Sequence, residues 1–238
     1  MSLPELTLKP YRLSPFYHKQ VSLNAKFVQD ENGWIRPERF NDSNEEKTTT
    51  ERSTGIYDIS HLAKLSLKGN DIVTTVSDLF NQKSNIGDLL VNGPGSFNEA
   101  ICAVLSNDEA ILITPPSSAE AASKQLNVEA EKCQTIDVST ILGGLYLLGG
   151  KSRAILSKLS ELNVNSETFP DRTATYASLH HVQCIVLRFD LGHLIGYQVY
   201  FERAYGEYVW DIIFHAGREF GAIPIGSSTI GLLGWRFG

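Results

Sequence analysis

Two stretches of alternating apolar and polar residues predict half-buried β-strands, each followed by a helix. Leu65-Ser-Leu-Lys-Gly69 alternates at every second residue, and a glycine turn and a helix to about Phe80 follow it. Gly144-Leu-Tyr-Leu-Leu-Gly149-Gly150 repeats this order and leads into an amphipathic helix from Lys151. Duplicated strand–helix units indicate an α+β protein of two modules, each a sheet with helices on one face.

Further strands and helices are predicted from the same patterns. Apolar runs predict four strands, at residues 100–105, 109–114, 181–189 and 196–201. Residues 119–133 predict a helix that breaks near Asn127. Residues 204–220 predict an amphipathic helix that Gly221 terminates, with an apolar face made of Tyr208, Ile212, Ala216 and Phe220.

One stretch is too polar to predict a regular element. The segment 41–54 reads as a linker, and its part Asp42–Glu51 mixes both signs of charge, which is typical of a solvated loop. The block that follows it, Gly55-Ile-Tyr-Asp-Ile-Ser-His-Leu62, reads as a polar turn that opens into the strand at Leu65.

Composition and charge exclude several classes of protein. The chain is 42% hydrophobic and 20% charged, as in ordinary globular proteins, and its net charge of −6 argues against a nucleic-acid partner. No apolar run approaches the roughly 20 residues of a membrane span. Met1-Ser-Leu-Pro-Glu lacks the basic start and apolar core of a secretory signal, so the expected location is the cytoplasm.

The cysteines and histidines predict no metal site. Cys102, Cys133 and Cys184 are odd in number and widely spaced, which indicates buried thiols rather than a disulfide or metal framework. His180 and His181 begin a strand without carboxylate or thiolate neighbours in the sequence.

Several segments, in order along the chain, together resemble one family, the glycine-cleavage T-protein or tetrahydrofolate-dependent aminomethyltransferases. The block at Gly55–Leu62 resembles the family's Gly-x-Phe-Asp-x-Ser-His-Met. The other matching segments are residues 15–37, Leu145–Arg153, Gly196-Tyr197 with the helix that ends at Ala216–Gly221, and Pro224-Ile-Gly226. The resemblance covers nearly the whole chain.

The resemblance implies a fold and a domain organisation. Two ferredoxin-like, aminomethyltransferase folate-binding modules are expected, with residues 1–54 plus 137–238 forming a discontinuous first module and residues 55–136 a second module inserted in it. Full-length members of the family add a C-terminal β domain, and this chain ends where that domain would begin. The implied cofactor is tetrahydrofolate.

The family places a catalytic carboxylate beside the folate N10, where it stabilises positive charge that develops in the reaction. Here the matching stretch is Gly95-Ser-Phe-Asn98-Glu99-Ala100. Counting forward from Asn92 puts Glu99 at the catalytic position, whereas counting back from Leu105 puts Asn98 there. Glu99 would keep the carboxylate and Asn98 would abolish its charge; an exposed loop pair without chemistry is the third alternative.

The positions that hold folate in the family are partly changed. The Glu that binds the pterin ring corresponds to Leu194, a second Glu to Gln198, and the late Ala-Arg-Asp motif to Thr229-Ile230-Gly231. A leucine cannot satisfy a pterin's donors, and each buried polar group left unpaired costs about 1–3 kcal/mol. The resemblance therefore implies weakened folate binding.

Six residues remain candidates for contact with tetrahydrofolate: Tyr57, Asp58, Ser60, His61, Tyr197 and Gln198. A structural role competes for three of them. Asp58 and Ser60 are typical turn and capping residues, and His61, three positions after Asp58, could be a histidine held by hydrogen bonds in the interior.

Three functions follow as hypotheses. The first is a divergent folate-dependent one-carbon transferase of weakened or lost activity. The second is a non-catalytic relative comparable to folate-binding iron–sulfur assembly factors, although their Lys-Gly-Cys-Tyr-x-Gly-Gln-Glu motif is absent from this sequence. The third is an accessory subunit resembling the γ chain of multimeric sarcosine oxidases, which implies a partner protein.

Overall fold

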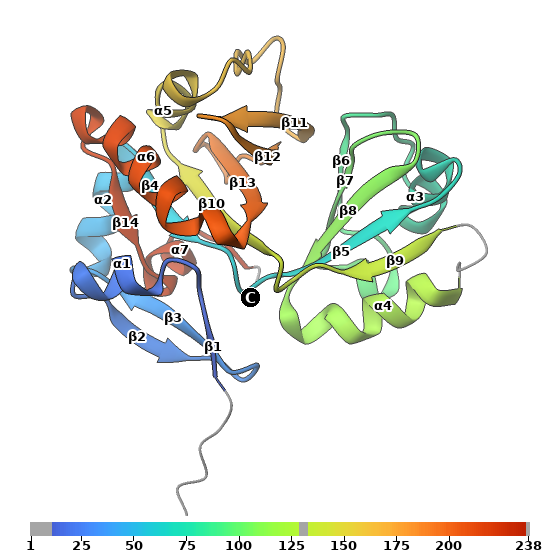
Figure 1. The fold of residues 1–238 in the computed structure, drawn as a ribbon, viewed down its shortest axis with the longest axis horizontal. Helices are drawn as coiled ribbons and strands as arrows, with labels where there is room; N and C mark the ends of the chain where they lie inside the picture. The colour runs from blue at the N-terminus through green and yellow to red at the C-terminus, as the bar shows by residue number, and fades with distance from the viewer. Residues whose placement is uncertain (1–10, 129–132, 237–238) are drawn as a thin grey trace, which may run out of the picture.

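The computed structural model describes residues 11–128 and 133–236, which fold around three β-sheets. In Figure 1 a six-stranded sheet lies on the left, a five-stranded sheet on the right, and a small three-stranded sheet at the lower left. Strands and helices alternate irregularly along the chain, so the predicted mixed α+β class is confirmed.

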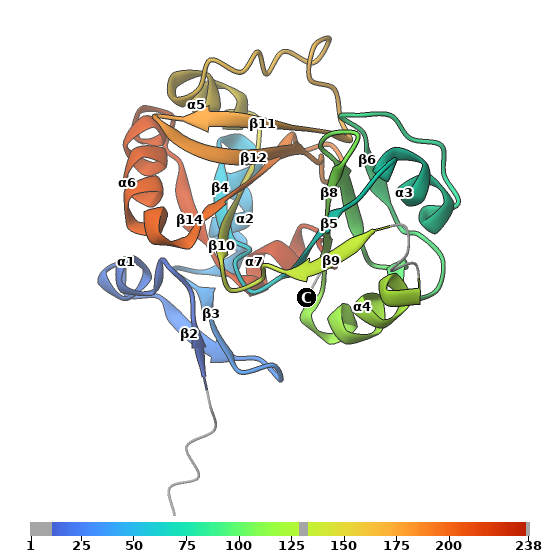
Figure 2. The same cartoon turned by 45° about the vertical axis from the view of Figure 1, so that its right-hand side comes forward.

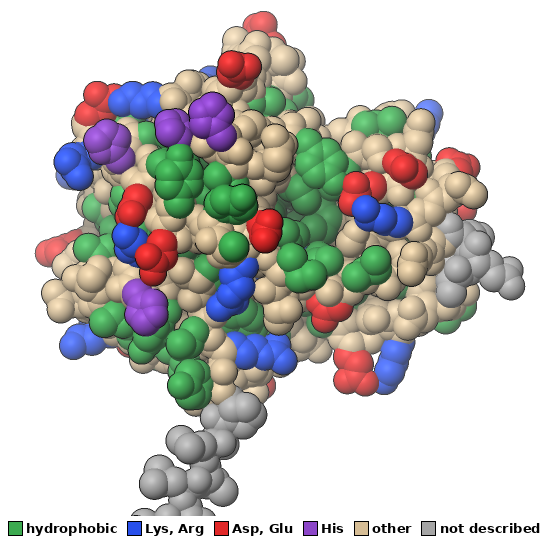
Figure 3. Space-filling model, viewed as in Figure 1, with side chains coloured by type: hydrophobic (Ala, Val, Ile, Leu, Met, Phe, Trp, Pro, Cys, Tyr) green, Lys and Arg blue, Asp and Glu red, His purple; other side chains and the backbone are tan. Residues whose placement is uncertain are grey.

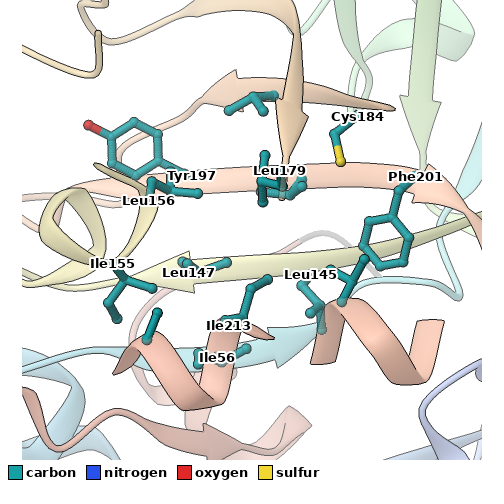
Figure 4. Packing of buried hydrophobic residues seen from close by; sticks show 14 of the residues in the cluster. Ile56, Leu145, Leu147, Ile155, Leu156, Leu179, Cys184, Tyr197, Phe201 and Ile213 are labelled. Atoms are coloured by element: carbon teal, nitrogen blue, oxygen red, sulfur yellow. The ribbon is translucent and has the colours of Figure 1, made fainter. Parts of the chain in front are cut away.

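The six-stranded sheet carries helices on one face. Its strand order is β11 (Thr173–Leu179), β12 (Val182–Arg188), β13 (Gly196–Glu202), β10 (Leu142–Leu148), β4 (Gly55–Asp58) and β14 (Ile223–Ile225). Helices α5 (Ser152–Leu159) and α6 (Gly206–Gly217) cover it, and their apolar residues Ile155, Leu156 and Ile213 pack against Leu147 and Tyr197 of the strands, as Figure 4 shows. This is the helix-side cluster.

The five-stranded sheet is built in the same way. Its order is β6 (Leu89–Val91), β7 (Ile101–Val104), β8 (Glu109–Thr114), β5 (Ala63–Lys68) and β9 (Gln134–Asp137). Helices α3 (Ile72–Phe80) and α4 (Ala119–Val128) cover one face, where Val76 and Leu126 meet Leu65, Leu67 and Leu112. Short 3-10 turns η1 (Gly95–Phe97) and η2 (Pro116–Ser118) precede β7 and α4.

The two sheets turn their other faces toward each other. Figure 2 shows them side by side with β4, β10 and β5 between the outer helices. Since side chains alternate along a strand, each sheet contributes its second set of residues to one shared cluster. This intersheet cluster contains, among others, Tyr57, Tyr146, Leu187, Leu194, Tyr200, Ile101, Ile113, Ile230 and Trp235.

The N-terminal and C-terminal segments pack together beside the large sheet. The three-stranded sheet has the order β1 (Arg12–Leu13), β3 (Trp34–Arg39) and β2 (Lys26–Gln29). Around it lie α1 (Tyr17–Ser22), α2 (Ser43–Arg52) and α7 (Ser227–Leu232), while η3 (Arg203–Tyr205) and η4 (Arg218–Phe220) flank α6. β14 pairs in parallel with β4. This pairing joins the large sheet to the segment that leads into α7.

A buried carboxylate ties these segments together. Glu46 of α2 is 1% exposed, and its Oε1 accepts hydrogen bonds from the backbone N–H groups of Phe40 (2.6 Å) and Asn41 (2.8 Å). Its Oε2 accepts from Gly226 N (3.0 Å) and the Thr229 hydroxyl (2.5 Å). One side chain thus joins β3, α2 and the start of α7.

A buried lysine joins the two chain segments that run between the large sheets. Residues 59–62 lead from β4 to β5, and residues 138–141 return from β9 to β10. Lys64, which is 0% exposed, donates from Nζ to the carbonyl oxygens of Ser60 (2.7 Å), Leu142 (3.1 Å) and Ser139 (3.3 Å). The backbone of Lys64 is also hydrogen-bonded to the segment 138–141, since Val138 N donates to Lys64 O at 2.9 Å.

Three predictions about local structure are wrong. The segment Asp42–Glu51 is helical rather than a loop, because the Asp42 carboxylate caps α2 by accepting from Asn44 N and Glu45 N. Gly55–Asp58 is a fully buried central strand and not a polar turn. The predicted apolar face of α6 is wrong at Tyr208, which is 42% exposed, and right at Ala216, which is buried with Val209, Trp210 and Ile213.

Other predicted elements were incomplete. Several observed elements have no counterpart in the predicted set: β1, β2, β3, β6, β9, β11, β14 and α1. The sequence pattern after Gly226 predicts a final strand, whereas the structure has helix α7 there. The helix predicted for residues 119–133 ends at Val128 among the described residues, and residues 129–132 of that prediction lie outside them.

The division into two modules remains a proposal. Sheet pairing favours moving its first boundary, because β4 pairs with β10 and β14 and not with any strand of the five-stranded sheet. We propose that the inserted module comprises residues 63–137.

The ammonium of Lys64 makes the stability of the fold depend on pH. Burial, opposed by the nearby Asp58 and Asp137, lowers the pKa of Lys64 from 10.5 to about 7. Between about pH 7 and pH 10.5 the unfolded chain therefore binds up to one more proton than the folded chain, so the free energy of unfolding should rise with pH in this window, by at most about 1.4 kcal/mol per pH unit. Urea denaturation at pH 7.5, 8.5 and 9.5 should show this rise in the wild type but not in Lys64→Met. Lys68→Met, which changes an exposed lysine of the same strand, should retain it; equal slopes in all three proteins would contradict the assignment.

Removal of the Glu46 carboxylate should leave four donors without an acceptor, and two of them, Gly226 N and the Thr229 hydroxyl, belong to buried residues. Glu46→Ala should lower the free energy of unfolding by roughly 3–5 kcal/mol, since the loss of one partner of a buried polar network exposes the full desolvation penalty of the rest. Glu45→Ala, an exposed neighbour on the same helix, should lower it by less than about 1 kcal/mol. Chemical denaturation of the two variants side by side measures the difference, and similar losses would show that the carboxylate has no special role.

Candidate functional site

Four of the six predicted folate contacts lie together where the chain leaves the large sheet. Tyr57 and Asp58 end β4, and Ser60 and His61 follow in the connection to β5. The Asp58 Oδ1 accepts from Ser60 N at 2.9 Å, and the Ser60 hydroxyl oxygen accepts from Gly144 N at 3.1 Å. These bonds hold the turn against β10, which is the structural role that the sequence offered as an alternative for Asp58 and Ser60.

The second carboxylate oxygen of Asp58 is also engaged. Gln20 of α1 donates from Nε2 to Asp58 Oδ2 at 2.7 Å, and the Gln20 side chain is 0% exposed. Asp58 thus joins α1 to the end of β4, and both of its oxygens accept hydrogen bonds from protein groups.

Arg36 of β3 connects the aromatic and imidazole groups of this turn. Its Nη1 lies 2.9 Å from His61 Nε2, its Nε lies 3.4 Å from the Asp30 carboxylate, and it also hydrogen-bonds the Tyr57 side chain. Because a guanidinium can only donate, His61 accepts through Nε2, which assigns its remaining proton to Nδ1. The ring of Tyr57 meets the imidazole edge to face, with centroids 6.1 Å apart.

The charge states of the two rings follow from burial. His61 is 3% exposed, and burial together with the Arg36 charge lowers its pKa well below 6.5, so it is neutral at pH 7. Burial raises the pKa of Tyr57 to about 12, against the opposing effect of Arg36. The Nε2 lone pair of His61 is engaged by Arg36 and Tyr57 keeps its proton at neutral pH, so neither ring is free to act as a general base in this arrangement.

His61 also lines a cavity of about 460 Å³ between the N-terminal sheet and the five-stranded sheet. Trp34, Arg12 and Asp137 line it with residues of α4 such as Lys124. Its walls mix aromatic, basic and acidic groups.

The two candidates for the catalytic carboxylate lie on a different element. Asn98 and Glu99 are both exposed in the loop between η1 and β7, and Ser96 N donates to Gln125 Oε1 of α4 at 3.1 Å to hold this loop. The next residues, Ala100 and Ile101, are fully buried. Which of the two exposed side chains occupies the family's position is a proposal.

Tyr197 and Gln198 point to opposite faces of β13. Tyr197 packs in the helix-side cluster, stacked on Phe169 with centroids 6.3 Å apart, and Figure 4 shows it close to Leu156. Gln198 stands opposite Tyr146 in the β10–β13 register, and Tyr146 stands opposite Tyr57 in the β10–β4 register. Directly opposed residues share a face, so Gln198 is on the side of Tyr57 and Tyr197 is not.

Leu194 and Ile230, at positions where the resembling family has polar folate-binding groups, are both buried in the intersheet cluster. They are 5% and 3% exposed. β13 approaches its neighbours closely at Gly196, because a Cβ on this residue would lie 2.3 Å from Phe189 O and 2.6 Å from the Tyr146 ring. The missing side chain lets the Tyr146 hydroxyl donate to Phe189 O at 2.6 Å.

Sequence reasoning missed Gln20, Arg36 and Lys64, which hydrogen-bond the turn at Asp58–His61. Alternation in Ala63–Lys68 places Lys64 on the face opposite Leu65. The sequence could therefore have assigned the lysine to the face of β5 that is turned toward the second sheet. Arg36 and Gln20 carry no such signal, because their partners are 25 and 38 residues away.

Among the described residues, no group of three or more His, Cys, Asp or Glu side chains is arranged to hold a metal ion. No helix of residues 11–128 or 133–236 has the length and apolar character that crossing a bilayer requires.

Comparison with known proteins identifies the family. Residues 16–234 match the GCVT N-terminal domain. The chain belongs to the glycine-cleavage T-protein family. The aminomethyltransferases of Moorella thermoacetica and Caldanaerobacter subterraneus subsp. tengcongensis are each 25% identical to it, over 223 and 234 residues. These matches cover 90% and 92% of this chain and 60% and 61% of the relatives, so the chain spans about 60% of the length of the curated relatives it matches.

Solved structures show the same fold. The glycine cleavage system aminomethyltransferase T from Bartonella henselae superposes with a TM-score of 0.76 at 19% identity, covering 92% of this chain and 61% of that one. A chain of the heterotetrameric sarcosine oxidase from Corynebacterium sp. U-96 superposes with a TM-score of 0.63 at 17% identity, covering 89% of this chain and 97% of that one. The T-protein family chain thus shares its mixed α+β fold with both.

The contact of Arg36 with His61 makes a direct prediction for the imidazole. Arg36→Met removes the adjacent positive charge and the donated hydrogen bond, so the pKa of His61 should rise, while burial keeps it below 6.5. NMR titration of the imidazole protons, with the His61 signal assigned by its loss in His61→Phe, measures the shift. Arg39→Met, at the exposed end of the same strand, should leave the titration unchanged; an unshifted His61 in Arg36→Met would show that Arg36 does not control it.

Proposed function

We propose that this chain is a divergent aminomethyltransferase-like protein whose tetrahydrofolate-dependent one-carbon transfer is weakened or lost. The observation that carries the proposal is the burial of Leu194 in the intersheet cluster, at the position where the family has the Glu that binds the pterin ring. An apolar side chain there offers no acceptor to a pterin. Ile230, which takes the place of the family's Arg, adds a second apolar residue to the same cluster.

The other predicted contacts support the same proposal. Both oxygens of Asp58 and the Nε2 of His61 are engaged by protein groups, and Tyr197 faces the helices on the far side of the sheet. Two lost anchors, at about 1–3 kcal/mol each, weaken an affinity by roughly two to four orders of magnitude. Glu99 is the residue through which remaining transfer activity would act, with Asn98 beside it as the uncharged alternative.

A second candidate function is that of an accessory subunit without its own active site. It is favoured by the match to 97% of one chain of a heterotetrameric sarcosine oxidase, a protein that assembles from several subunits. On this proposal the partner is another protein chain in the cytoplasm, and the turn at Asp58–His61 serves structure alone. A role in iron–sulfur assembly has less support, because the motif of that branch is absent.

Tetrahydrofolate binding separates the proposal from an active transferase. Calorimetric titration of the purified chain under anaerobic conditions should give no binding tighter than about 1 mM, because the two anchor positions are apolar. The Moorella thermoacetica aminomethyltransferase serves as positive control in the same cell. Glu99→Ala and the matched surface variant Glu161→Ala should both behave as the wild type.

The opposite result is equally clear. Micromolar binding of tetrahydrofolate that is lost in Glu99→Ala and kept in Glu161→Ala would overturn the proposal and identify Glu99 as the working carboxylate.

A further inference from the structure

A cavity of about 710 Å³ lies beside β11, the outer strand of the six-stranded sheet. Residues 176–178 of β11 line one side of it, and residues 157–162, at the end of α5 and in the segment after it, line the other. Figures 1 and 2 show β11 at the edge of its sheet, with the chain that leaves α5 passing above it. No residue of the five-stranded sheet lines this cavity, so it lies outside the space between the two sheets.

Other parts of the chain pair with the outer edge of β11 at both of its ends. At the start of the strand, Ala174 N donates to Gly87 O at 2.8 Å. Just after the strand, His180 N donates to Leu159 O at 2.8 Å, which ties the β11–β12 hairpin to the end of α5. These two hydrogen bonds limit the free part of the edge to residues 175–179, which we call the open stretch.

The open stretch presents backbone groups to the cavity. The backbone groups of alternate residues in a strand point to the same edge, so Tyr176 and Ser178 direct their N–H and C=O groups outward, as Ala174 does. Among the described residues, no strand except β12 pairs with the open stretch. The Tyr176 carbonyl accepts from the Thr175 hydroxyl at 3.2 Å. Both Tyr176 and Ser178 are exposed and line the cavity.

An open strand edge can bind an extended peptide, because the backbone of the peptide then completes the sheet. The open stretch has five residues, which span about 17 Å at about 3.3 Å per residue. The segment 157–162 provides a second wall at this edge. Side chains of an added strand would alternate between the two faces of the sheet, so specificity depends on the side chains that line the cavity.

The walls of the cavity favour basic and apolar side chains. Lys158 lines it but forms an ion pair with Glu219. Glu161 is exposed and forms no ion pair with any residue that the structure describes. Leu162 and Ala177 add apolar surface that is continuous with the helix-side cluster. Since the chain also carries a net charge of −6, a basic partner is favoured over an acidic one.

We propose that the open stretch of β11 is a docking site for an extended segment of a partner protein in which basic and apolar residues alternate. The backbone of this segment pairs with Tyr176 and Ser178, and one of its basic side chains pairs with Glu161. The inference goes beyond the proposed function, because it uses none of the predicted folate contacts and neither candidate for the catalytic carboxylate.

The probe for the test is the peptide acetyl-Lys-Val-Lys-Val-Lys-Val-amide. In calorimetric titrations it should bind the wild-type chain at least about tenfold more tightly than acetyl-Glu-Val-Glu-Val-Glu-Val-amide does. NMR should show that the basic peptide slows hydrogen exchange at the Tyr176 and Ser178 amides. The Thr175 and Ala177 amides, which face β12, should exchange slowly with and without it.

Methylation of the peptide backbone distinguishes strand addition from a non-specific charge effect. N-methyl groups on the three lysines remove the donors of one edge of the extended peptide, and N-methyl groups on the three valines remove those of the other edge. Only one of these two patterns should abolish binding, because an added strand pairs through one edge.

Protein variants locate the site. Ser178→Pro removes an outward N–H and places a ring at the edge, so it should weaken binding of the basic peptide at least about tenfold, whereas Ser178→Ala keeps the donor and should bind as the wild type does. Glu161→Gln should weaken binding up to about fivefold at low salt. Glu167→Gln, which changes another exposed acid of the segment after α5, should not.

The proposal is overturned if the wild type does not bind the basic peptide, or if a folded Ser178→Pro variant binds it equally well. If that variant does not fold, unchanged exchange of the Tyr176 and Ser178 amides in the peptide-saturated wild type overturns it instead. A dimer of the free chain that Ser178→Pro abolishes would assign the edge to a second copy and would also contradict the proposal. The proposed function is decided separately, by tetrahydrofolate binding.

Discussion

The face-to-face packing of two sheets over one apolar cluster is the constraint on which the rest of this structure depends. Each sheet already buries one face under helices, so its second face must find another cover, and the second sheet provides it. Figure 3 shows the two halves of the molecule pressed together, with apolar side chains in the hollow between them. Any site between the sheets must therefore be made by omitting or replacing side chains of this cluster. In this chain, Leu194, Ile230 and Trp235 are members of this cluster.

Polar groups in the interior hold the arrangement at two places where chain segments cross. Lys64 joins the two connections between the sheets, and Glu46 joins the N-terminal segment to the start of α7. A charge in the interior is tolerated only where several partners surround it, and these two side chains have three and four hydrogen bonds respectively. The turn at Asp58–His61 follows the same rule, because the side chains that the sequence offers as candidates for chemistry form hydrogen bonds that hold this turn in place.

Periodicity predicted the strands and helices with apolar faces well, and failed where burial depends on distant partners. The strands at Ile101–Val104 and Glu109–Thr114 and the helix from Lys151 agree with the structure. The helix at Ser43–Arg52 was missed because its residues are polar, and it is stabilised by a cap and by Glu46 rather than by an apolar stripe. Tyr197 was grouped with Tyr57 because both are aromatic and near matching motifs, but the parity of its position along β13 turns it to the other face.

By itself, the sequence determined the family and the mixed α+β class, because the motifs at Gly55–Leu62 and Gly196-Tyr197 keep their order and spacing. It also predicted that a polar anchor of the family is replaced at Leu194. Only the tertiary structure decided three further facts: burial together with Arg36 keeps His61 neutral, carbonyl groups surround the Lys64 ammonium, and Trp235 contacts Tyr146 and Phe189. The physical reason is that local pattern specifies which face of an element is apolar, whereas burial, pKa and the occupancy of a site depend on groups that folding brings from elsewhere in the chain.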